Sequence, residues 1–149
     1  MSRKVMNTVN SVAIIGAGNM GSGIAQKSAQ EQFNVQMVDR EKQWVDRGEK
    51  IINDFLEEAI QRRIFKPEKV EEIKSRITGV VGTENVAPDT DLVIEAVFED
   101  FNIKKDVFNI LDRVCGDKTI LASNTSSLSV NELAKATGRP DKFVGLHFF

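Results

Sequence analysis

Short apolar runs alternate with longer amphipathic stretches along this chain. The first run, residues 12–15, is apolar throughout, which is typical of a strand covered on both faces in a parallel sheet. Similar short runs recur, and the second of them alternates between apolar and polar residues. We expect strands at residues 12–15, 35–38, 77–81, 92–94, 119–122 and 143–146.

The stretches between these runs have helical periodicity. We expect helices at about residues 19–30, 42–64, 67–75, 101–111 and 129–137. Ser129 is a good N-cap for the last helix, and Glu132, three residues on, completes a capping box. The longest helix carries one apolar stripe, which we expect to contain Trp44, Gly48, Ile51, Ile52, Phe55, Leu56, Ala59 and Ile60.

Strands that alternate with helices at this spacing predict right-handed βαβ units. The expected fold class is therefore α/β, with a Rossmann-type, doubly wound and mostly parallel sheet and flanking helices. The sequence has no internal repeat, low-complexity tract or linker rich in Pro or Ser. Its 149 residues are expected to form one domain, 1–149.

Composition narrows the possible ligands. The 20 Lys and Arg residues nearly balance the 22 Asp and Glu residues, and they are spread along the chain. This pattern predicts no attraction to nucleic acid or to an anionic membrane, so an anionic ligand must be held by local geometry. No apolar run approaches the roughly 18 residues of a membrane span, and the first ten residues lack the apolar core of a secretory signal. We therefore expect a cytoplasmic protein.

The chain contains one histidine and one cysteine. These are too few for a structural zinc site or a Cys/His hydrolase, and no metal is expected. Cys115 has no partner for an internal disulfide and no basic neighbour. We expect it to be an unreactive residue of the core or of a helix end.

A glycine motif, G-x-G-x-x-G, follows the first strand at residues 16–21. Gly16 permits a tight turn, Gly18 lets a pyrophosphate approach the backbone, and Gly21 allows the helix to pack close to the strand. The free amides of the helix N-terminus, at Asn19 and Met20, then face the phosphates. Any tight turn between a strand and a helix can recruit glycine, so the motif alone is weak.

Asp39 strengthens the motif because it ends the second strand, roughly 20 residues beyond the loop. A carboxylate there can accept both hydroxyls of an adenosine ribose, and it repels a 2′-phosphate. The sequence therefore favours NAD over NADP, although Arg40 next door could soften that preference. The alternative is a surface Asp that begins the loop before the long helix.

Polar residues follow the later strands at the carboxyl edge of the sheet, where open α/β sheets bind ligands. Residues 123–127 either line a site or form a polar turn before Ser129. Glu95 and Glu99 follow the fourth strand. Either one of these carboxylates binds a ligand, because a buried carboxylate needs a partner, or both simply begin the next helix. His147 follows the sixth strand, either as a proton acceptor from an alcohol that loses hydride or as a packed core residue.

Five motifs at this spacing resemble the NAD-binding half of the 3-hydroxyacyl-CoA dehydrogenases: GAGNMGSGIAQ, VDR, DLVIEAVFED, ILASNTSSLS and GLHFF. The resemblance covers about residues 10–149. It implies that His147 is the catalytic base and that Ser126 contacts the reacting substrate oxygen. It also implies that Glu99 and Lys104 lie near the nicotinamide ribose. The residues expected to bind NAD are Gly16, Gly18, Asn19, Met20, Gly21, Asp39, Arg40, Glu99, Lys104 and Asn124.

The resemblance also implies what this chain lacks. In the family the last motif continues to a Glu that orients the histidine and to a helical second domain that completes the acyl-CoA cleft and the homodimer interface. We therefore expect an isolated cofactor domain that binds NADH but turns over acyl-CoA poorly. A basic residue at the end of the long helix corresponds, by a loose match only, to the family's contact with the CoA phosphates; the candidates are Arg62, Arg63 and Lys66. A non-catalytic dinucleotide-binding module, as in the related crystallins, and a dehydrogenase of a sugar acid are the alternatives.

Overall fold

A computed structural model describes residues 8–149 of the chain. Residues 1–7, on which part of the expectation about a secretory signal rests, lie outside the described residues. Within the described part, no helix is long and apolar enough to cross a membrane.

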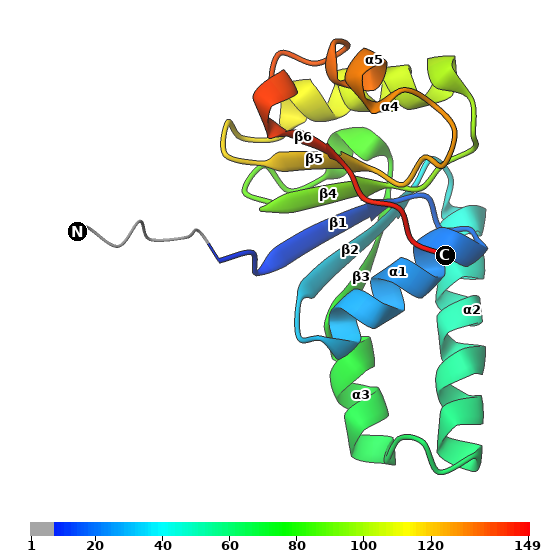
Figure 1. Cartoon of the computed structure of the whole chain (residues 1–149). Helices are drawn as coiled ribbons and strands as arrows, with labels where there is room; N and C mark the ends of the chain where they lie inside the picture. The colour runs from blue at the N-terminus through cyan, green and yellow to red at the C-terminus, as the bar shows by residue number, and fades with distance from the viewer. Residues whose placement is uncertain (1–7) are drawn as a thin grey trace.

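Six parallel strands form one sheet in the order β3-β2-β1-β4-β5-β6 (Figure 1). The order reverses direction between β1 and β4, which is the switch point where doubly wound sheets bind their ligands. The predicted fold class is confirmed. The strands are β1 (Ser11–Ile15), β2 (Asn34–Asp39), β3 (Ile77–Val81), β4 (Leu92–Glu95), β5 (Ile120–Ser123) and β6 (Phe143–Gly145).

Helices cover both faces of the sheet (Figure 1). In β1, Val12 and Ile14 pack into the core beneath α1, α2 and α3, whereas Ala13 and Ile15 face α4 and α5. All four side chains are buried, which is why the run shows no alternation. The helices are α1 (Asn19–Gln30), α2 (Lys42–Gln61), α3 (Pro67–Ser75), α4 (Phe101–Val114) and α5 (Val130–Ala134).

α2 ends three residues before the expected position. Arg63 adopts a left-handed φ of 58°, and the amides of Arg63 and Ile64 turn back to the carbonyls of Ile60 and Ala59. This is the hydrogen-bond pattern of a Schellman motif, which usually has glycine at the left-handed position. α1 ends in the same way at Gln32, with φ of 74°.

The apolar stripe of α2 was predicted only in part. Its buried residues include Val45, whereas Phe55 is 52% exposed and Trp44 is half-buried. The expected inward position of Phe55 is therefore wrong, because the helix turns the Val45, Ile52 and Leu56 side toward the sheet.

α5 is shorter than expected. The amides of Ala136 and Thr137 bond to carbonyls three residues back, so the chain tightens into turns after Ala134. Ser129 caps the helix by accepting a hydrogen bond from the Glu132 amide at 3.3 Å. The predicted capping box is incomplete, because the Glu132 carboxylate pairs with Lys135 instead.

Candidate functional site

The glycine loop lies between β1 and α1, at the carboxyl edge of the sheet. The Gly16 amide donates to the Val38 carbonyl at 2.7 Å, and Gly16 has a φ of +108°. A β-carbon at position 16 would lie 2.6 Å from the carbonyl oxygen of Ala96. The loop therefore turns in a narrow gap between β2 and the end of β4, where only glycine fits.

The start of α1 is built to face an anion. A β-carbon at Gly21 would lie 1.7 Å from the Gly16 carbonyl oxygen, so the loop and the helix touch there. In contrast, nothing lies within 4 Å of a β-carbon placed on Gly18, the N-cap residue. The first turn contains no acidic residue, and its free amides point outward at the positive end of the helix dipole.

Asp39 is joined directly to the glycine loop. Its Oδ2 accepts a hydrogen bond from the Ala17 amide at 2.9 Å, and its Oδ1 accepts one from the Arg40 amide at 2.7 Å. The side chain of Arg40 is exposed and pairs with Glu41. Asp39 therefore lies beside the loop, as a ribose ligand must, rather than only at the start of the following connection.

A buried ion pair lies beyond β4, at the same edge of the sheet. The Nζ of Lys104, on α4, lies 2.5 Å from Oε1 of Glu95, and both side chains are almost fully buried. The Nζ also lies 3.2 Å from Oε2 of Glu99, which is 39% exposed. Lys104 therefore stands behind Glu99, with a carboxylate on each side of its ammonium group.

The loop after β5 bonds to this cluster. Glu99 accepts hydrogen bonds from the hydroxyl of Thr125 and, at 3.0 Å, from the hydroxyl of Ser127. Ser126, between them, is exposed. Of the two alternatives for residues 123–127, the polar turn is present, and a ligand-lining role stays a prediction. The turn leads to the Ser129 cap and brings the exposed Ser126 to the edge of the sheet that carries Glu99.

The pKa of Glu99 is set by opposing effects. Burial by itself raises the pKa of this carboxyl, but hydrogen bonds from Thr125, Ser127 and Lys104, together with the Lys104 charge, lower it from 4.5 to about 2. Glu99 is therefore ionised throughout the physiological pH range. Its carboxylate can only accept hydrogen bonds, and the hydroxyls of Thr125 and Ser127 donate them.

We expect the stabilising effect of Glu99 to disappear in acid. Because its pKa is lower in the folded chain, its contribution is complete above pH 4.5 and is lost as the pH falls toward about 2. The free energy of unfolding, from urea titrations of the parent chain and the Glu99→Gln variant, should differ most at about pH 6 and least at about pH 2. A difference that does not change with pH would contradict this expectation.

His147 is exposed, so the alternative of a packed core histidine is wrong. Its ring centroid lies 5.6 Å from that of Phe149. The backbone around it is held to the β5 loop, because the Leu146 amide donates to the Ser123 carbonyl at 2.9 Å and the Phe148 amide donates to Oδ1 of Asn124 at 2.6 Å. Among the described residues, no carboxylate forms an ion pair with His147.

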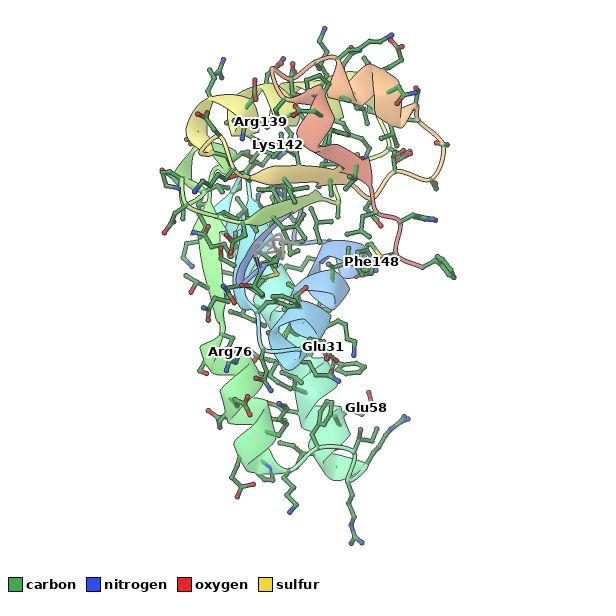
Figure 2. All side chains as sticks on the ribbon, turned by 60° about the vertical axis from the view of Figure 1, so that its left-hand side comes forward. Glu31, Glu58, Arg76, Arg139, Lys142 and Phe148 are labelled. Atoms are coloured by element: carbon green, nitrogen blue, oxygen red, sulfur yellow. The ribbon has the colours of Figure 1, made fainter. Side chains whose placement is uncertain are left out.

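The His147 segment also approaches the glycine loop. A cavity of about 360 Å³ lies between the N-terminal half of α1 and the chain end, and Figure 2 shows Phe148 beside that helix. Met20, which is 42% exposed, lines this cavity. The structure therefore gathers the glycine loop, the Ser126 loop and His147 at one edge of the sheet. The cavity is lined by Asn19, Met20, Gly23, Ile24, Lys27, Phe148 and Phe149.

Sequence reasoning named the residues at this edge but missed the bonds that join them. Ser123 and Thr125 bond to Glu95 and Glu99, and Asn124 bonds to the backbone of Phe148. Hydroxyl residues directly after a buried strand, opposite a carboxylate that ends the neighbouring strand, are the signal that could have predicted these bonds. No cluster of three or more metal-ligating side chains occurs among residues 8–149.

Comparison with known proteins extends these observations. The family described as "3-hydroxyacyl-CoA dehydrogenase, NAD binding domain" matches residues 11–149. The 3-hydroxybutyryl-CoA dehydrogenase of Clostridioides difficile is 42% identical over 138 residues, which are 93% of this chain and 49% of that protein. The mitochondrial hydroxyacyl-coenzyme A dehydrogenase of Homo sapiens is 38% identical over 146 residues, 95% of this chain and 46% of that protein.

A solved structure agrees with these sequences. The (S)-3-hydroxybutyryl-CoA dehydrogenase of Ralstonia eutropha superposes with a TM-score of 0.91 at 37% identity, over 95% of this chain and 50% of that one. This chain spans about half the length of the relatives it matches.

The described residues fit a dinucleotide. The open space at Gly18 accommodates a diphosphate at the helix N-terminus, and the Asp39 carboxylate lies beside it for a ribose. NAD is the cofactor that this fold and family bind. The chain therefore belongs to the NAD-binding domain family of the 3-hydroxyacyl-CoA dehydrogenases.

Proposed function

We propose that this chain supplies the cofactor site and the catalytic base of an enzyme that reversibly oxidises a (3S)-3-hydroxyacyl-CoA to the 3-oxoacyl-CoA. One observation carries the proposal. The exposed His147 lies on a segment tied by the Phe148 amide to Asn124, in the loop that also carries the exposed Ser126. A proton acceptor and a hydroxyl donor thus lie on joined segments at the edge of the sheet that holds the dinucleotide loop.

In the proposed reaction, an unprotonated imidazole nitrogen of His147 accepts the proton of the C3 hydroxyl while the C3–H bond breaks. Bound NAD supplies the acceptor for the hydride that leaves C3. The Ser126 hydroxyl donates a hydrogen bond to the C3 oxygen and so orients the substrate. Glu99, with Lys104 behind it, faces the nicotinamide ribose, and Asn124 contributes to the same end of the cofactor site.

At the other end of the cofactor, we propose that Asp39 selects NAD over NADP. Its Oδ2 already accepts the Ala17 amide of the glycine loop and its Oδ1 accepts the Arg40 amide, and its charge disfavours a 2′-phosphate. Arg40 is exposed next to it and is the residue able to weaken this preference.

The substrate and assembly belong to the proposal too. The relatives' names support an acyl-CoA substrate. Arg62, Arg63 and Lys66 lie exposed in the turn between α2 and α3, and one of them is proposed to meet CoA phosphates. A homodimeric parent and a cytoplasmic location stay predictions from the sequence.

The test uses a protein of the relatives' length that carries this domain. We expect His147→Ala to lower kcat for NADH-dependent reduction of acetoacetyl-CoA by about 1000-fold while NADH affinity changes less than about twofold. NADH binding without turnover in the parent would favour the non-catalytic module. Turnover that free CoA does not inhibit would favour a sugar-acid dehydrogenase. Full activity of His147→Ala would remove the base assignment.

A further inference from the structure

Glu95 is the most completely buried carboxylate at the ligand edge of the sheet, with no exposed surface. It ends β4 and reaches three other parts of the fold. Its Oε1 accepts hydrogen bonds from Lys104 of α4 at 2.5 Å and from the Val97 amide at 2.8 Å. Its Oε2 accepts one from the Ser123 hydroxyl, at the end of β5, at 2.6 Å. One side chain thus fixes two strand ends and a helix.

Bonds continue outward from these partners to the surface. Lys104 connects Glu95 to Glu99, and Glu99 holds the hydroxyls of Thr125 and Ser127 on the two sides of Ser126. The Ser123 hydroxyl in turn accepts a hydrogen bond from the Thr125 amide at 3.2 Å. The loop of residues 124–127 is therefore tied to Glu95 by two separate routes, one through Lys104 and one through Ser123.

A role in stability alone does not account for this arrangement. Taking a carboxylate and an ammonium out of water costs several kcal/mol per ion, roughly, and apolar residues of similar volume often stabilise a core as well or better. The cluster has two carboxylates for one ammonium, and its outermost member, Glu99, is partly exposed beside Ser126. A buried cluster of charges that ends at a ligand edge is typical of a network that holds the side chains of a binding site in place.

We propose that Glu95 is a positioning residue, which holds Lys104 and Ser123 so that Glu99 and Ser126 are preset for the nicotinamide half of NAD. The inference rests on the proposed roles of Glu99 and Ser126. Glu95 itself touches neither cofactor nor substrate. If Glu95 loses its charge, the Lys104 ammonium has only Glu99 as a counterion. The carboxylate of Glu99 then turns away from Ser127 and toward Lys104.

The test compares two ligands that differ only at the nicotinamide end. NADH and ADP share the adenosine diphosphate portion, which the glycine loop and Asp39 are proposed to bind, and only NADH carries the nicotinamide and its ribose. In calorimetric titrations of the 149-residue chain, Glu95→Gln is expected to weaken NADH binding by about 10-fold and ADP binding by less than about twofold. The change in the ratio of the two dissociation constants is the readout, because a general loss of structure weakens both ligands together.

Two controls separate positioning from stability. Ile73→Ala removes a fully buried side chain of α3, on the other face of the sheet, and is expected to lower stability without changing the ratio. Ser123→Ala cuts one of the two routes without leaving a buried charge unpaired. It is expected to change the ratio in the same direction by a smaller amount, and it serves as the test should Glu95→Gln fail to fold.

The outcomes are distinct. If the parent chain binds neither ligand, the proposed function fails. If the parent binds both, and the folded variants at 95 and 123 keep the parental ratio, the positioning role of Glu95 is wrong while the cofactor site stands. A selective loss of NADH affinity in these variants, with Ile73→Ala unchanged, supports the proposal.

Discussion

Alanine at position 21 is expected to destabilise the domain by about 4 kcal/mol or more and to abolish NADH binding. The added β-carbon would lie 1.7 Å from the Gly16 carbonyl oxygen and 2.7 Å from its carbonyl carbon. Those atoms belong to a backbone that cannot move freely, because Gly16 is held by Val38 on one side and lies against Ala96 on the other. The start of α1 must therefore separate from β1, and the diphosphate site opens with it.

Urea unfolding and NADH titration of Gly21→Ala measure both parts of this expectation. Gly23→Ala is the matched control, since it lies two residues further along the same helix with open space around its added β-carbon. It should stabilise α1 by about 0.5–1 kcal/mol through helix propensity. Gly18→Ala should keep its stability and lose NADH binding, because its β-carbon fills the space that the diphosphate needs. Parental stability of Gly21→Ala would refute the close contact.

Arg139→Ala is expected to cost about 3 kcal/mol of stability. The guanidinium, nine-tenths buried, bonds to Oδ1 of Asp112 at 2.8 Å and to the backbone carbonyls of Asp112, Cys115 and Gly116 at 2.6–3.1 Å (Figure 2). It therefore satisfies the carbonyls at the C-terminal end of α4 and balances a partly buried carboxylate. Removal takes a donor from these carbonyls and leaves the Asp112 carboxylate with the Gly138 amide but without its counterion, and each such loss is costly in a buried setting.

The control for this prediction is Arg113→Ala, which removes an exposed arginine from the last turn of the same helix. Its effect on the free energy of unfolding should lie within about 0.5 kcal/mol of zero. If the two substitutions changed the free energy of unfolding equally, the hydrogen bonds of Arg139 would contribute no more to stability than an exposed arginine does. NADH affinity, measured below the unfolding transition, should not change in either variant, because Arg139 lies away from the glycine loop.

The fold was predictable because its signals are local and repeated. The unbroken apolar run of β1 indicates burial on both faces, and Ile14 and Ile15 indeed enter opposite cores. The bounds expected for the first and third helices and for the third strand agree with the structure. Asp39 ends β2 as expected and lies beside the glycine loop, bonded to the Ala17 amide, while its contact with a ribose stays a prediction.

Other features depend on contacts that no local pattern carries. Arg63 takes a left-handed conformation without glycine, so the end of α2 was hidden in the sequence. Phe55 is exposed although it repeats at helical spacing, because the face that α2 presents is set by the sheet. Lys104 is buried because it forms ion pairs with the carboxylates of Glu95 and Glu99. These groups come together only in the folded chain, when α4 packs beside the end of β4.

The bond between Asp39 and the Ala17 amide links cofactor selectivity to the shape of the glycine loop. A redesign toward NADP usually begins by removing the acidic residue at this place in the fold. Here that change would also release the amide that the carboxylate holds, and the loop would gain freedom next to the diphosphate. A successful redesign must therefore put a neutral acceptor of similar reach at position 39, so that the charge is removed while the loop keeps its anchor.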